Sequence, residues 1–299
     1  MKLAEKPVFA AVLGATIIAG SGTLTKLANE TPATVAVWRC IWALPILFIL
    51  SRREDRQFGK RSRRERVLTS IAGAAFTLDL ILWHWSIREI GAGMATVLGN
   101  LASVVVALLV WVIFREKPSM QLVAILPVVL FGVVLTTGVV GGKGYGINPT
   151  LGVIFGIACS IAYALFIVVY REGAKDLRRL AGPLLDTTFV GGLFALAVGP
   201  LVGGIHLFPS WHSQIWLIAL GLSCQVLGWL VIAIALPRLP ASLVALILLI
   251  QPVGGIAISA VVLGERPSAM QLFGALVIVG GVAFAVRGSR TRIDVPEVV

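Results

Sequence analysis

Apolar residues in this chain gather into ten long runs, separated by short connections that contain proline, glycine or charge. Each run is roughly 20 residues long, which is the length that crosses the core of a bilayer as a helix. The connections are short enough to join antiparallel neighbours. We therefore expect an all-α membrane protein with ten transmembrane helices. The predicted spans are Pro7–Ala28, Pro32–Ser51, Val67–Ile87, Ala92–Phe114, Met120–Val139, Pro149–Tyr170, Pro183–Gly203, Gln214–Leu236, Ala241–Leu263 and Ala269–Val286.

The second half of the sequence repeats the first. The run Ala92–Phe114 precedes Glu116–Ser119 (Glu-Lys-Pro-Ser), and the run Ala241–Leu263 precedes Glu265–Ser268 (Glu-Arg-Pro-Ser). Five spans per copy is an odd number, so the two copies enter the membrane from opposite sides, as in many secondary transporters. The predicted organisation is a first repeat over 1–140, an inverted second repeat over 149–287, and a cytoplasmic tail over 288–299.

The placement of Lys and Arg predicts the orientation. With the N-terminus inside, twenty of the 25 basic residues fall in inside segments, and four fall outside or on the outer flanks. Arg39 is the one cation within a span. Because Lys and Arg concentrate on the cytoplasmic side, we expect both termini to be cytoplasmic, with the protein in the cell inner membrane.

Composition agrees with this picture and excludes several classes of function. The chain is 58% hydrophobic and 13% charged, whereas soluble domains are about 45–50% apolar and 25% charged. The net charge of +11 lies in short loops and forms no extended basic face, so we expect no nucleic-acid partner. Cys40, Cys159 and Cys224 lie inside apolar runs without ligand spacing and are interpreted as small buried hydrophobes. No catalytic, ATP-binding or metal-binding motif is present, so we expect no enzyme activity and no cofactor.

The sequence Gly264–Ser268 and its echo at Glu116–Ser119 resemble the EamA family of the drug/metabolite transporter superfamily. Pro32 before a span that contains Arg39, Pro252 within the ninth span, and the Gly280-Gly281 pair extend the resemblance over nearly the whole chain. Two positions depart from the family pattern and make the copies asymmetric. They are Ser103, where proline is expected, and Arg115, where glycine is expected. The resemblance implies a ten-helix inner-membrane carrier, most similar to the exporters of aromatic amino acids.

Asp79 is the most conspicuous candidate for substrate binding. An ionised carboxylate in the middle of a span costs roughly 2.5–3.5 kcal/mol on insertion scales, and such groups face a cavity, a partner or an ion path. Asp79 is therefore predicted to contact a substrate ammonium or to carry a proton, the alternative being a structural hydrogen bond. Trp83 lies one turn further along the same face. His84 is adjacent to it and is either functional or bonded between helices.

Arg39 and Trp42 are candidates from the second span. The guanidinium suits a substrate carboxylate, which it can bind through two hydrogen bonds. The alternatives are a structural or gating role for Arg39 and an interfacial anchor for Trp42.

Polar and aromatic side chains in other spans complete the predicted cavity. A buried amide must find a partner on another helix, in water or on a substrate. A mostly apolar pocket with a few directed polar groups suits an amphiphilic small molecule; helix–helix bonding is the alternative for each residue. These candidates are Asn100, Ser160, Tyr163, Gln225, Trp229 and Gln251.

Pro252, Gly254 and Gly255 make the ninth span the best candidate for a hinge. Glu116 and Glu265 are interpreted as structural charges at helix starts, where the helix dipole favours an acid. The basic loop from Arg52 to Arg66 is expected to contact lipid headgroups.

The duplicated architecture predicts a secondary transporter that works by alternating access. The resemblance implies that it exports amino acids, preferably aromatic or large apolar ones, or related metabolites. A carrier of drugs, cations or other metabolites, and a passive channel, are the alternatives. The expected partners are a small-molecule substrate and the lipid bilayer.

Overall fold

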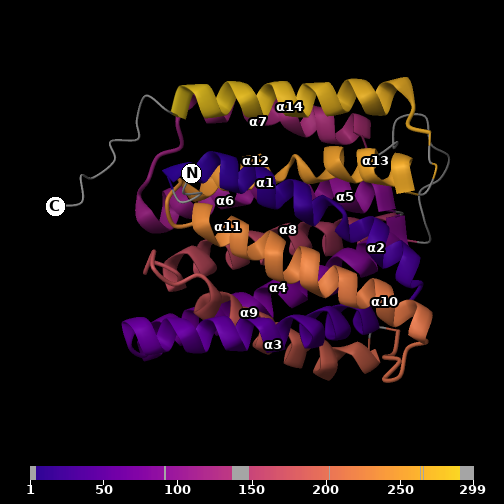
Figure 1. Ribbon diagram of the computed structural model, residues 1–299. Helices are drawn as coiled ribbons and strands as arrows, with labels where there is room; N and C mark the ends of the chain where they lie inside the picture. Colours follow the sequence, from indigo (N-terminus) through magenta and orange to yellow (C-terminus); the bar gives the residue numbers. More distant parts are fainter. Residues whose placement is uncertain are drawn as a thin grey trace.

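The computed structural model is an all-helical bundle whose helices run along one common direction (Figure 1). The structure describes residues 5–90, 92–136, 148–201, 203–262, 264 and 266–289, and these residues contain no strand. The first half contains α1 (Pro7–Ala19), α2 (Ser21–Ala28), α3 (Pro32–Phe58), α4 (Arg63–Ile90), α5 (Ala92–Asn100), α6 (Ala102–Phe114) and α7 (Met120–Thr136). The second half contains α8 (Pro149–Gly173), α9 (Ala181–Val198), a 3₁₀ turn (Gly199–Leu201), α10 (Trp211–Leu220), a π-helical segment (Gly221–Gly228), α11 (Trp229–Ala235), α12 (Ala241–Leu248), α13 (Gln251–Val262) and α14 (Ala269–Ser289).

Eight helical segments of the described residues are long and apolar enough to cross a membrane, and two shorter apolar stretches, Met120–Leu135 and Ala269–Ala285, accompany them. The shorter two belong to α7 and α14, which pack against each other at one edge of the bundle (Figure 1). Many large apolar side chains point outward along the bundle, among them Phe48, Phe131 and Phe284, each at least half exposed. This apolar outer surface suits contact with lipid.

Several helices extend beyond the predicted spans. α3 runs to Phe58 and α4 begins at Arg63, so most of the predicted loop from Arg52 to Arg66 is helix. Arg, Glu and Gln are good helix formers, so a polar sequence can continue a helix beyond an apolar run. The fifth predicted span, Met120–Val139, ends outside the described residues.

The two halves correspond at a spacing of 149 residues, which is the spacing of Glu116 and Glu265. With this spacing α3 corresponds to α9, and α4 to the α10–α11 rod. α4 packs most extensively against α8 and also contacts α9, while α1 packs against α11. The two halves are therefore interleaved and share one core.

Three of the helical rods are interrupted near their middle. α1 gives way to α2 at Gly20, α5 to α6 at Leu101, and α12 to α13 at Leu249–Ile250. Leu101 and Ile250 lie 149 residues apart, so the second and third interruptions occupy matching positions in the two copies. Interrupted helices at matching positions are a common feature of transporter substrate sites.

Candidate functional site

A cavity of about 330 Å³ lies where the three interruptions meet. Ser21, Ser103 and Pro252 come from the segments beside the three breaks and all line it. The remaining wall comes from α3, α4, α8 and α11, so both copies of the repeat contribute. Non-helical backbone at membrane depth is tolerated where it lines such a cavity.

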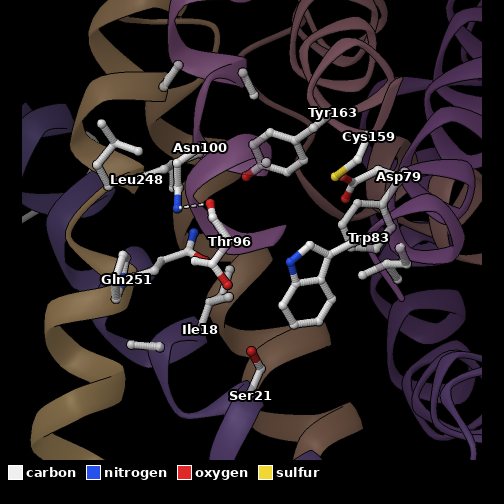
Figure 2. A pocket seen from close by; sticks show the side chains of 18 of the residues that line it. Ile18, Ser21, Asp79, Trp83, Thr96, Asn100, Cys159, Tyr163, Leu248 and Gln251 are labelled. Carbon is white, nitrogen blue, oxygen red and sulfur yellow. Dashed lines mark hydrogen bonds between the residues drawn. The ribbon is translucent and has the colours of Figure 1, made fainter. Parts of the chain in front are cut away.

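Asp79 and Trp83 lie on one side of the cavity, on the face of α4 that also carries Phe76 (Figure 2). Asp79 is 9% exposed. Its Oδ1 accepts a hydrogen bond of 3.0 Å from the thiol of Cys159 on α8. Because a thiol is a weak donor, this bond leaves much of the hydrogen-bonding capacity of the carboxyl group unused. Asp79 is thus a buried acid on a cavity wall with one weak protein donor at Oδ1.

Arg39 on α3 also lines the cavity and is 7% exposed. Its guanidinium carbon lies 5.8 Å from the centre of the Phe76 ring, a cation–π distance. Nε and Nη2 are buried and have no hydrogen-bond partner in the described part of the chain. A buried donor without a partner costs about 1–3 kcal/mol, and more when it is charged. Arg39 therefore presents unused donors beside the cavity.

The opposite side of the cavity is formed by amide and hydroxyl groups (Figure 2). The Asn100 amide donates to the Thr96 carbonyl one turn earlier, at 2.8 Å, which leaves its side-chain oxygen available. Tyr163 on α8 and Gln251 at the start of α13 also line the cavity. Trp229 on α11 completes the aromatic part of the wall, 5.6 Å from Phe76 between ring centres. Most of the predicted cavity residues therefore meet around one space.

His84 and Trp42 are candidates that do not line this cavity. The Nδ1 of His84 donates to the Leu80 carbonyl at 2.7 Å within α4, and its ring stands edge-on to Trp83. The indole N–H of Trp42 donates to Gln214 at 2.9 Å, which joins α3 to α10. His84 is thus bonded within its own helix rather than between helices, whereas Trp42 joins two helices.

Ser160 and Gln225 also lie away from the cavity. The Ser160 hydroxyl donates to the Ile157 carbonyl at 2.8 Å within α8. The Gln225 amide donates to the Thr188 hydroxyl at 3.1 Å, so it joins the π-helical segment to α9. The Ser160 bond thus lies within one helix and the Gln225 bond joins two helical elements, and neither residue lines the cavity.

The hinge candidates lie directly after the third interruption. Pro252 is the second residue of α13, and Pro252 and Gly255 line the cavity. A Cβ atom at Gly254 would meet the Ala19 methyl group at 2.6 Å, so this glycine allows α13 to approach α1. Motion at this hinge remains a prediction.

Sequence reasoning missed Cys159 and Phe76. Cys159 was interpreted as a small hydrophobe, yet its thiol donates to the one acid on the cavity wall. Phe76 lies one turn before Asp79, and that helical spacing was the available signal. Neither residue type suggests chemistry by itself.

The predicted role of Glu116 at a helix start needs correction. Ser119 caps α7, since its hydroxyl accepts the Leu122 N–H at 3.2 Å. Glu116 instead pairs with Arg171 at 3.6 Å, between the end of α6 and the end of α8. Ser268 accepts the Gln271 N–H in the same way at the start of α14, whereas Glu265 lies outside the described residues.

The cavity wall combines charged, polar and aromatic groups. Among the described residues no group of three His, Cys, Asp or Glu side chains is placed to hold a metal ion. The wall offers one acid, one guanidinium, amides, hydroxyls and several rings. Such a wall suits a small molecule that carries both charged and apolar parts.

Comparison with known proteins agrees with the duplicated architecture. The model of the EamA-like transporter family matches residues 5–138 and again 150–287. An uncharacterized transporter of Bacillus subtilis is 23% identical over 91% of this chain and 86% of its own length. An uncharacterized transporter of Archaeoglobus fulgidus is 26% identical over 75% of this chain and 78% of its own.

A protein of known crystal structure shares the fold, with a TM-score of 0.78 and 18% identity over 94% of this chain and 98% of that one. The two family matches coincide with the two copies found in the sequence, which confirms the resemblance. This chain belongs to the EamA-like transporter family.

Proposed function

We propose that this protein is a secondary transporter that moves amino acids, preferably aromatic or large apolar ones, or related metabolites, out of the cytoplasm by alternating access. The observation that carries the proposal is the cavity between the two copies, which combines a buried acid, a buried guanidinium and aromatic rings. A site at the boundary between inverted repeats can be exposed to either side by rocking one copy against the other.

The proposed placement in the inner membrane has ten crossings and both termini in the cytoplasm. Supporting it, α1 begins and α14 ends at the same end of the bundle (Figure 1). The basic connections between α3 and α4 and between α8 and α9 lie at that end too. Positively charged connections on one side favour that side as cytoplasmic. A C-terminal reporter that is active only in the cytoplasm tests this, and a reporter active only outside would overturn it.

The rocking motion is proposed to use the interruption before Pro252. Gly254 and Gly255 add freedom there, and a residue without Cβ lowers the cost of local bending. The matching interruption at Leu101 in the first copy has no proline, so the two copies would bend differently.

The test is counterflow in proteoliposomes. Vesicles that contain the protein and unlabelled amino acid should accumulate labelled amino acid transiently and saturably, with and without a pH gradient. Saturable counterflow is the property of a carrier. Flux that rises linearly with concentration and shows no counterflow would favour the channel, and counterflow with organic cations but no amino acid would favour the other substrate class.

A further inference from the structure

Arg39 is a cation held beside the cavity without a partner for two of its nitrogens. Nε and Nη2 are buried and form no hydrogen bond in the part of the chain that the structure describes. The guanidinium carbon lies over the Phe76 ring, 5.8 Å from its centre, a contact that satisfies none of the N–H groups. A planar fork of free donors is the geometry that binds a carboxylate through two hydrogen bonds.

Asp79 is the matching feature of opposite sign. Its carboxyl group lines the same cavity, and the donor at Oδ1 is the thiol of Cys159. Two opposite charges in one cavity would satisfy each other if they formed an ion pair. Here Asp79 bonds to α8 while Arg39 keeps unused donors. The cavity therefore holds two separate charged positions.

The positions of these groups suit one small molecule. The guanidinium carbon is 5.8 Å from the centre of the Phe76 ring, and Asp79 follows Phe76 by three residues, about one helical turn. Both charged side chains therefore lie near the same ring on the cavity wall. An α-amino acid carries its ammonium and its carboxylate on one carbon atom, so a single molecule can offer one group to each of them.

We propose that the cavity recognises the zwitterionic head of an α-amino acid, with Arg39 binding the carboxylate and Asp79 binding the ammonium. This inference rests on the proposed function and deepens it. The side chain of the substrate then lies against Trp83, Trp229 and Leu248. Each of the two protein charges remains without a full partner unless the ligand carries both groups. The site therefore selects against simple amines and simple acids of the same shape.

The experiment measures competition against counterflow of labelled L-phenylalanine in proteoliposomes. The competitors are unlabelled L-phenylalanine, phenethylamine, which lacks the carboxylate, and 3-phenylpropionate, which lacks the ammonium. For the unsubstituted protein, phenylalanine should compete at a concentration at least about 10-fold lower than either partial molecule. In Arg39→Gln, phenylalanine should no longer compete at a lower concentration than phenethylamine, but it should still compete at a lower concentration than phenylpropionate. Asp79→Asn should show the reverse pattern.

Two further variants keep the test decisive. Arg39→Lys keeps the positive charge but loses the planar pair of N–H donors. Competition by phenylalanine and by phenylpropionate should therefore weaken, while competition by phenethylamine should not change. Arg178→Gln, on the exposed connection between α8 and α9 and away from the cavity, should leave the competition by all three unchanged. Monodisperse elution in detergent verifies the fold of each variant.

The outcomes separate this inference from the function on which it rests. If phenylalanine shows counterflow but the amine or the acid competes equally well, the zwitterion assignment fails and the transporter stands. If competition by all three molecules weakened equally in Arg39→Gln and in Asp79→Asn, both residues would have a structural role. That result would also overturn the zwitterion assignment. If neither phenylalanine nor any other amino acid shows saturable counterflow, the proposed substrate class itself is wrong.

Discussion

The two copies of the repeat use the same positions around the middle of the bundle for different purposes. Arg39 and Phe76 in the first copy correspond to Thr188 and Gln225 in the second, at the spacing of 149 residues. Arg39 lies over the Phe76 ring and keeps unused donors, whereas Gln225 donates to Thr188 at 3.1 Å. Matching helix positions thus form a cation–π contact beside the cavity in one copy and a hydrogen bond in the other.

A third pair of matched positions also has a different role in each copy. Asp79 corresponds to Gly228, where an added Cβ would meet the Ile18 side chain at 2.6 Å. Gly228 therefore allows α1 to pack closely, while Asp79 supplies the acid of the cavity. Duplication accounts for the fold, and divergence at matched positions accounts for the charges of the site.

The ends of the bundle differ as well. Glu30 corresponds to Arg179, and each contacts the other copy: Glu30 accepts a hydrogen bond from His206 Nδ1 at 2.7 Å, and Arg179 forms an ion pair with Asp55 at 3.0 Å. At the Arg179 end Glu54 also accepts three backbone N–H bonds of 2.8 Å at the start of α9. In the described residues, Glu54 and Arg179 thus both join the two copies at the end predicted to face the cytoplasm.

Gly73 in the first copy corresponds to Leu222 in the second. Replacing Gly73 by leucine should have the largest effect of the substitutions considered. A Cβ at Gly73 would collide with the backbone carbonyl of Thr187 on α9, whereas Leu222 is 38% exposed. Backbone cannot yield as a flexible side chain can, so Gly73→Leu should abolish folding. The measurement is the monodisperse fraction after size-exclusion chromatography in detergent.

Gly22→Ala is the control, because nothing lies within 4 Å of the added Cβ. It should elute like the unsubstituted protein. Folded Gly73→Leu protein with unchanged yield would show that α4 and α9 do not approach as closely as described.

The second prediction compares the two ends. Arg61 donates to Asp186 at 2.7 Å and to Thr69 at 3.1 Å, with side chains only 5% and 16% exposed for the ion pair. Breaking a buried pair costs about 3–5 kcal/mol, so Arg61→Ala should lower the melting temperature markedly. Glu30→Gln should cost less than about 1 kcal/mol, because its partner His206 is 64% exposed.

Thermal unfolding in detergent gives both values, and Arg61→Lys is the matched control that retains the charge. Equal losses at the two ends would contradict the asymmetry. A larger loss for Glu30→Gln would reverse it.

The third prediction contrasts Gln225 with Arg39. Gln225→Leu removes the bond to Thr188 but also a buried side-chain oxygen that has no partner in the described chain. The stability change should therefore be about 1 kcal/mol. Competition among phenylalanine, phenethylamine and phenylpropionate should remain as in the unsubstituted protein. A changed order of competitors would return Gln225 to the substrate site.

Much of the architecture was predictable because it depends on regular patterns. Ten apolar runs and the repeat of Glu116–Ser119 at Glu265–Ser268 indicated the duplicated helical bundle, and the family matches agree with both copies. Asp79 and Gln251 were found because a polar group in an apolar span must have a partner or a cavity.

Which candidate residues line the cavity could not be predicted, because this depends on the orientation of each helix about its own axis. Gln225 and Asn100 are both amides within spans, yet Asn100 lines the cavity and Gln225 faces Thr188. The sequence alone does not define which face of a helix packs against which neighbouring helix. The break at Leu101 was also missed, because the first copy has Ser103 where the second has Pro252.

The smallest expected effect concerns the connection between α8 and α9. Two hydrogen bonds from the Arg178 guanidinium, of 2.9 and 3.0 Å, lower the pKa of Asp176 from 3.8 to about 2. A carboxyl group whose pKa is lowered on folding stabilises the protein above its unfolded pKa. This contribution is lost as the pH falls from about 4 through 2. The matched position in the first copy is Leu27, so the other end has no equivalent.

Asp176→Asn should therefore melt slightly below the unsubstituted protein at pH 7, and the difference should shrink towards zero between pH 4 and pH 2. Comparing the two proteins at each pH cancels the titration of all other acids. Since both hydrogen bonds join one pair of side chains, adding Arg178→Gln to Asp176→Asn should cause little further loss. A difference that stays constant down to pH 2, or two losses that add fully, would mean that the pair does not stabilise this end of the bundle.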